Sequence, residues 1–202
     1  MSILVYAPAT VANVGVGFDL LGVAVAPVDG SILGDLVEVE RAAEGIELIC
    51  EGPWKSKLPD DVHDNIVYKC AEGFLAKLPA AARTGLRIRL KKNLPVGSGL
   101  GSSASSVVAV THALNKLFDL LFNDREMLEM MGEFEGLVSG SVHYDNVAPC
   151  YLGGMQLMLQ TPDRFCDAVP AFAGWFWVIA YSGLSLPTAK MRQLLKNTVK
   201  AP

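Results

Sequence analysis

Apolar and polar positions alternate along the chain at two spacings, and together these predict a mixed α/β fold. Strands with a buried face are indicated where apolar residues follow one another or alternate with charged residues. The expected strands cover residues 3–6, 36–40, 46–50, 86–91, 154–160 and 175–181. The second and third of these flank Glu44-Gly45, so we expect them to pair as a hairpin.

Apolar residues at helical spacing predict the helices. One covers residues 66–78, with Asp64 as its cap. A second follows the serines after Gly101 and carries small apolar residues suited to burial against a sheet. A third begins at Asn123 with a capping-box sequence, and a last one covers residues 188–196.

The composition is that of a chain able to bury a sizeable core. Its 202 residues are 51% hydrophobic, with a net charge of −4 and a pI of about 5.4. The acidic balance argues against a nucleic-acid partner. The first residues lack a basic leader and soon reach Pro8, so we expect no signal peptide, no membrane anchor and a cytoplasmic location. The four cysteines show no CxxC spacing and are expected to be buried free thiols.

A glycine- and serine-rich segment between an expected strand and an expected helix carries the clearest chemical signal. Residues 93–106 read NLPVGSGLGSSASS. Glycines let a backbone approach an anion closely, and the free N–H groups and dipole of a helix start favour negative charge. No lysine follows the last glycine, so this is not a Walker A loop. A serine-capped flexible turn fits the loop alone equally well, but the strand before it favours a phosphate cradle.

With this loop, residues 95–105 resemble the PxxxGLGSSA signature of the GHMP small-molecule kinases. Two further segments resemble the homoserine kinases among them. One is APATVANVGVGFDLLG at residues 7–22, and the other runs from Glu135-Gly136 through HYDNVAP at 143–149 to Gly153-Gly154. Three motifs in this order are far more specific than any one of them, and the resemblance extends over essentially the whole chain.

The resemblance implies an α+β two-layer fold in two domains. Residues 1–165 would form an ATP-binding domain like domain 2 of ribosomal protein S5, with a left-handed βαβ crossover, and residues 166–202 would begin a ferredoxin-like domain. Full-length homoserine kinases continue for about 100 residues more, roughly one further domain. We therefore expect this chain to be truncated, to self-associate as a homodimer or otherwise through unfinished apolar surface, and to be a slow enzyme.

The resemblance also implies an alcohol phosphotransferase that makes O-phospho-L-homoserine from ATP and L-homoserine, for threonine synthesis. The loop would bind ATP, and Asn65 would lie near the adenine, although a helix cap suits Asn65 equally. The ATP-binding candidates are Asn65, Pro95, Val96, Gly97, Ser98, Gly99, Leu100, Gly101, Ser102 and Ser103. Glu135, with Ser102 or Ser103, would hold Mg²⁺, which prefers oxygen ligands and needs few carboxylates beside phosphate and water.

Polar residues of the other motifs are candidates to hold homoserine. They are Asn13, Asp19, His143, Asp145 and Arg192. The resemblance matches Asp19 to the substrate ammonium group and Arg192 to its carboxylate. A structural alternative stays open for these candidates. Residues 13–19 also suit an Asx turn, residues 145–146 also suit a turn, and Arg192 also suits the surface of an ordinary helix.

Asn146 stands where mevalonate-type kinases carry an aspartate assigned as the base. Because an amide cannot accept the proton, we expect direct attack of the hydroxyl on the γ-phosphate. Glu135, Asn146 and Ser103 would then be the catalytic residues and act by orientation and charge neutralisation. Two alternatives remain: a weakly active or inactive nucleotide-binding module, and a GHMP kinase for another small alcohol.

Overall fold

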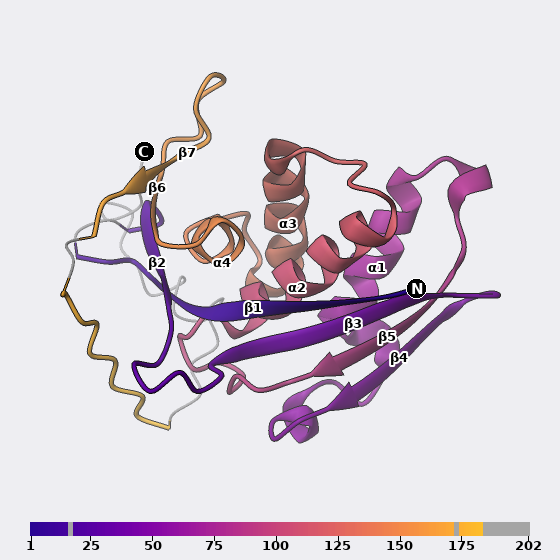
Figure 1. Cartoon of the computed structure of the whole chain (residues 1–202), viewed down its shortest axis with the longest axis horizontal. Coiled ribbons are helices and arrows are strands. Elements are labelled where there is room, and N and C mark those ends of the chain that lie inside the picture. Colours follow the sequence, from indigo (N-terminus) through magenta and orange to yellow (C-terminus); the bar gives the residue numbers. More distant parts are fainter. Residues whose placement is uncertain (16–17, 172–173, 184–202) are drawn as a thin grey trace.

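In the computed structural model, which describes residues 1–15, 18–171 and 174–183, seven strands form one sheet in the order β4-β5-β3-β1-β2-β6-β7. The strands are β1 (Ser2–Ala12), β2 (Leu21–Val25), β3 (Gly34–Ala42), β4 (Ile46–Glu51), β5 (Gly85–Lys91), β6 (Met155–Met158) and β7 (Cys166–Val169). The α-helices are α1 (Ile66–Lys77), α2 (Ser102–Leu117), α3 (Asp124–Ser139) and α4 (Val147–Leu152). Helices α1, α2 and α3 cover one face of the sheet, so the molecule has two layers (Figure 1).

Strand β1 joins the two halves of the sheet and is longer than the strand expected at residues 3–6. Residues 2–8 pair with β3, and residues 9–12 pair with β2 on the other side. The strands β2, β6 and β7 therefore lie at one end of the molecule, with α4, and β3, β5 and β4 lie at the other (Figure 1). The first sequence motif begins on this strand, at the point where the halves meet.

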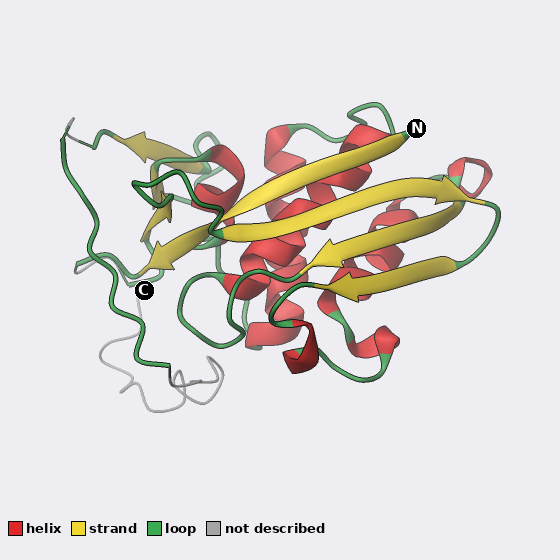
Figure 2. Cartoon of the chain, turned by 60° about the horizontal axis from the view of Figure 1, so that its bottom comes forward, coloured by secondary structure: helices red, strands yellow, loops and turns green. Residues whose placement is uncertain are grey.

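The expected hairpin between residues 36–40 and 46–50 is wrong. Strand β5 lies between β3 and β4, antiparallel to β3 and parallel to β4, and α1 makes the crossover from β4 to β5 (Figure 2). Alternation marks a half-buried strand but does not specify its neighbour. The alternation of β5 itself is confirmed, because Leu86, Ile88 and Leu90 are buried under the helices.

The three long helices lie where their spacing predicted, and one cap differs. Asn123 and Glu126 form the expected capping box of α3. Helix α1 is capped by Asn65, whose side chain accepts a hydrogen bond from the Val67 N–H at 3.0 Å, so the prediction of Asp64 as the cap is wrong. Asp64 belongs to the short 3-10 turn before it.

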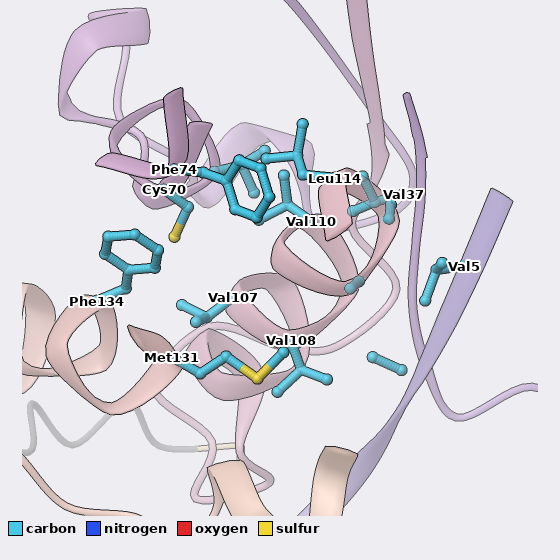
Figure 3. Packing of buried hydrophobic residues seen from close by; sticks show 14 of the residues in the cluster. Val5, Val37, Cys70, Phe74, Val107, Val108, Val110, Leu114, Met131 and Phe134 are labelled. Atoms are coloured by element: carbon cyan, nitrogen blue, oxygen red, sulfur yellow. The ribbon is translucent and has the colours of Figure 1, made fainter. Parts of the chain in front are cut away.

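Helix α2 is the centre of the core. It packs against the sheet, α1 and α3, and nearly all of its side chains are buried. Figure 3 shows Val107 and Val108 of α2 with Phe74 of α1 and Met131 of α3, among the buried residues of the main cluster. The small apolar residues of α2 permit this close packing on both sides.

The C-terminal part of the described chain differs from expectation. The strand at residues 154–160 is confirmed as β6, but residues 175–181 are an exposed loop, so the strand expected there is wrong. A strand needs a hydrogen-bonded neighbour, and in the described part of the chain the sheet ends at β7. The expected helix at 188–196 lies outside the described residues. The domain division after residue 165 stays a prediction, as does self-association, and β7 pairs with β6 in the same sheet.

Two smaller observations bear on the composition. All four cysteines are free; Cys70 and Cys150 are buried as expected, and Cys50 and Cys166 are half-buried. None of the helices in the described ranges is long and apolar enough to cross a membrane.

Candidate active site

The glycine-rich loop joins the end of β5 to the start of α2. Gly97, Gly99 and Gly101 all have positive φ, between 62° and 77°, which favours glycine. The Ser98 hydroxyl donates to the Pro95 carbonyl at 2.7 Å and accepts from the Leu100 N–H at 3.3 Å, so it shapes the loop from within. No side chain caps α2, which leaves its N-terminus free to receive an anion.

Buried Glu135 of α3 and partly exposed Ser103 of α2 form a hydrogen-bonded pair beside this helix start. The Ser103 hydroxyl donates to Glu135 Oε1 at 2.6 Å. Glu135 is 4% exposed, and its Oε2 has no hydrogen-bond partner among the described residues. The pKa of Glu135 is raised, mainly by burial. The Ser103 hydrogen bond and the charges of His143 and Lys92 act in the opposite direction and offset part of this shift. A buried carboxylate with one free oxygen is suited to a cation.

These residues fit a magnesium ion that keeps most of its ligands from phosphate and water. Nowhere in the described ranges do three or more His, Cys, Asp or Glu side chains gather in a way that could hold a metal. Glu135, whose Oε2 has no hydrogen-bond partner in the described structure, would be the protein carboxylate of such a site. Ser103 contacts Glu135, whereas the Ser102 hydroxyl donates to the Leu94 carbonyl at 3.3 Å.

The segment His143–Asn146, just before α4, lies close to this pair. His143 Nδ1 and Asp145 Oδ1 are 3.1 Å apart, and both side chains are buried. His143 Nε2 is buried and has no partner among the described residues. Asp145 therefore contacts the imidazole at Nδ1, and Nε2 on the other side of the ring makes no hydrogen bond to the described residues. The charges of both residues act on Glu135, which joins the two parts of the site.

The three sequence motifs meet at Gly101. The Thr10 hydroxyl of β1 donates to Asn146 Oδ1 at 2.8 Å, and the Thr10 N–H donates to the Leu100 carbonyl at 3.1 Å. A Cβ atom at Gly101 would lie 1.9 Å from Thr10 Oγ1 and 3.0 Å from Asn146 Oδ1. The contact between strand, loop and third motif thus requires glycine at this position.

The remaining candidates are placed differently. The Asn13 side chain accepts from the Asp19 N–H at 2.9 Å and closes the turn between β1 and β2, which leads into Gly22. A Cβ at Gly22 would lie 1.6 Å from the Asp145 carbonyl oxygen, so the third motif packs directly against β2. The turn closed by Asn13 therefore leads into the strand that supports the third motif. Asn65 caps α1 and contacts Cys50, and no hydrogen bond joins it to the glycine loop. Arg192 lies outside the described residues.

Three residues at the site are absent from the sequence-based candidates. They are Thr10, Asp35 and Lys92, all of them buried. Asp35 and Lys92 pair beneath the glycine loop. A charged residue at the start of a strand, or beside a loop, ordinarily faces solvent, so the sequence alone carries no signal for either. Thr10 lies within the first motif, and its burial in the folded chain is what separates it from the other polar residues of that motif.

Comparisons with known proteins agree with this arrangement. Residues 65–154 match the family model of the GHMP kinases N-terminal domain. The chain is similar to homoserine kinase from Cytophaga hutchinsonii, with 35% identity and a TM-score of 0.78, over 97% of this chain and 60% of that one. It is also similar to a Listeria monocytogenes protein assigned as a homoserine kinase, with 26% identity and a TM-score of 0.60, over 84% of this chain and 54% of that one.

A more distant likeness shows the fold alone. Mevalonate kinase from Methanococcus jannaschii is 16% identical, with a TM-score of 0.63, over 85% of this chain and 56% of that one. The chain thus spans less than two thirds of each of these three structures.

Proposed function

We propose that this chain is a small-molecule kinase of the GHMP type that transfers the γ-phosphate of ATP to the hydroxyl of L-homoserine. The match of residues 65–154 to the GHMP kinases N-terminal domain and the similarity to the Cytophaga hutchinsonii homoserine kinase support this. The products would be ADP and O-phospho-L-homoserine. Since the chain spans only part of its longer relatives, the activity, substrate and metal of the whole protein all belong to this proposal.

One observation carries the proposal. A glycine loop and an uncapped helix start lie beside the hydrogen-bonded Ser103–Glu135 pair, and His143 and Asp145 of the third motif lie close enough to act on the charge of Glu135. Donors for phosphate, an oxygen for a cation and polar groups for an amino acid therefore share one site. The similarity to the Cytophaga hutchinsonii homoserine kinase supports homoserine as the amino acid.

In the proposed reaction the chain mainly positions its substrates. Glu135 and Ser103 would hold Mg²⁺, which neutralises phosphate charge when bound. The homoserine oxygen forms the new P–O bond, the bond from the γ-phosphorus to the bridging oxygen breaks, and the hydroxyl proton passes to solvent. Thr10 donates to the oxygen of Asn146, so the amide nitrogen is the atom left to face a ligand. Asn146 would therefore supply a donor rather than a base.

A pair of variants tests these roles. Glu135→Gln should lower kcat by about 100-fold or more and weaken the dependence on magnesium, because a metal stabilises several kcal/mol of transition-state charge. Asp19→Asn should chiefly raise the KM for homoserine. Steady-state kinetics with varied homoserine and magnesium measure both.

Glu133→Gln is the matched control, because Glu133 lies two residues away on α3 and forms an exposed ion pair with Lys77. It should keep wild-type constants. The assignment of the site would be wrong if Glu135→Gln and Asp19→Asn also kept them.

A further inference from the structure

A buried ion pair lies directly beneath the glycine loop. Lys92 Nζ is 2.5 Å from Asp35 Oδ2, and the two side chains are 2% and 0% exposed. The same ammonium group donates to the Ser102 carbonyl at 2.6 Å and to the Ser106 hydroxyl at 2.9 Å. Its three hydrogens are therefore all used. Burial lowers the pKa of Lys92, and the neighbouring Asp35 carboxylate opposes that shift.

Asp35 holds the opposite end of the same loop. Its Oδ1 accepts from the backbone N–H groups of Asn93 and Leu94, at 2.9 and 3.1 Å. Its Oδ2 accepts from Ser106 at 2.7 Å as well as from Lys92. The entry to the loop is thus bonded to Asp35, and the exit, at the Ser102 carbonyl, is bonded to Lys92.

Stability alone does not explain this arrangement. A buried ion pair can often be replaced by apolar side chains of similar volume without loss of stability, because desolvation cancels most of the attraction. Apolar side chains, however, cannot bond to the Asn93 and Leu94 N–H groups or to the Ser102 carbonyl. What the ion pair adds is therefore a fixed position for both ends of the loop.

We propose that Asp35 and Lys92 are positioning residues that hold the glycine loop and the first turn of α2 in the geometry that binds phosphate. The predicted effect on nucleotide binding rests on the proposed function, whereas the predicted effect on the position of the loop does not. Neither residue is proposed to touch the substrates.

The test replaces the pair with apolar residues of similar volume, Asp35→Leu together with Lys92→Met. Hydrogen exchange without nucleotide should show the amides of residues 93–106 exchanging about fivefold faster or more relative to the core amides, beyond any change in the overall stability of the chain. Calorimetric titration with magnesium ATP should show affinity about tenfold weaker or more. Lys77→Met with Glu133→Leu, which removes an exposed pair of the same charges, should change neither.

A folded double variant with wild-type exchange in residues 93–106 overturns the proposal, whatever its nucleotide affinity. Faster exchange supports it even if the wild-type chain binds no ATP, in which case only the proposed function fails. If the double variant does not fold, Ser106→Ala decides the question, because it removes a hydroxyl bonded to both residues and keeps both charges. Its loop should exchange faster than wild type, and an unchanged loop would refute the positioning role.

Discussion

Thr10 connects the first motif to the third through a single hydroxyl group. That hydroxyl donates to the side-chain oxygen of Asn146 at 2.8 Å, and Thr10 is fully buried. A hydrogen bond to the amide oxygen fixes which end of the amide points toward a ligand. The orientation of Asn146 therefore depends on a residue that lies far from it in the sequence.

Thr10→Val keeps the shape of the side chain and removes the donor. We expect kcat to fall about 5- to 10-fold, since an intramolecular hydrogen bond contributes roughly 1 kcal/mol and the amide is then free to turn. Thr10→Ser keeps the hydroxyl and should retain most of the activity. Equal kcat in the valine and serine variants would show that the hydroxyl does not position Asn146.

At the scale of elements, the third motif packs onto glycines of β2 and α3. A Cβ at Gly22 would meet the Asp145 carbonyl at 1.6 Å, and a Cβ at Gly132 would lie 2.1 Å from the Tyr144 ring. Tyr144 in turn contacts Phe165, with the ring centroids 4.8 Å apart. The absence of a side chain on two different elements thus sets how closely the segment 143–146 approaches the core.

Two glycines one turn apart on α3 provide a matched test. Gly132→Ala should lower the free energy of unfolding by about 1–3 kcal/mol through overpacking, and it should raise the KM for homoserine by moving Tyr144. A Cβ at Gly136 would lie 3.3 Å from the Val142 side chain and 3.6 Å from the backbone of Ser141 and Val142, so Gly136→Ala should be neutral or stabilising by up to about 1 kcal/mol from helix propensity. Urea unfolding compares them, and a Gly132→Ala protein as stable as Gly136→Ala would contradict the packing argument.

The contact between α2 and α4 contains a partly buried histidine. The His112 ring lies edge-on to Tyr151, with centroids 5.4 Å apart, and its Nδ1 is buried without a partner in the described structure. Burial, and then the charge of Lys116, lower the pKa of His112, while Asp124 acts in the opposite direction. The folded chain therefore resists protonation at a pH where the unfolded chain already binds a proton.

Stability should accordingly fall as the pH drops below about 6.5, the ordinary histidine value, toward the lower pKa of the folded state. His112→Phe keeps the ring contact and removes the titration. The wild type should lose about 1 kcal/mol or less relative to this variant between pH 7.5 and 5, because the site is only half-buried. His63→Phe is the control, since exposed His63 makes a similar contact with Tyr68. A difference in stability between the wild type and His112→Phe that does not change with pH would show that His112 is not the group responsible.

At the scale of the whole molecule, the elements were more predictable than their partners. Residues 36–40 and 46–50 are strands as expected, but the pairing of each with β5 depends on the crossover helix between β4 and β5. Strand β2 has only five residues and begins at the end of the glycine-containing first motif. Helix α4 has only six residues, and one of them is a proline. Neither is long enough to show a period, so both were missed.

The residues of the site likewise divide into those that the sequence predicted and those that it did not. Motif resemblance located the loop, Glu135 and the segment 143–146, and the structure brings them together. It did not identify Asp35 or Lys92, whose role depends on burial that only the folded sheet creates. For Asn65, the alternative of a helix cap is what the structure shows. The ligands of Asp19 and Arg192 stay predictions.

The central claim is that this chain phosphorylates homoserine, and ³¹P NMR of the reaction mixture tests it most directly. Purified chain is incubated with magnesium ATP and, in separate samples, with L-homoserine, mevalonate or no alcohol. We predict a new phosphate monoester signal only with homoserine, and its loss in the Glu135→Gln variant. A monoester formed from mevalonate instead, or ATP consumption that homoserine leaves unchanged, would contradict the account.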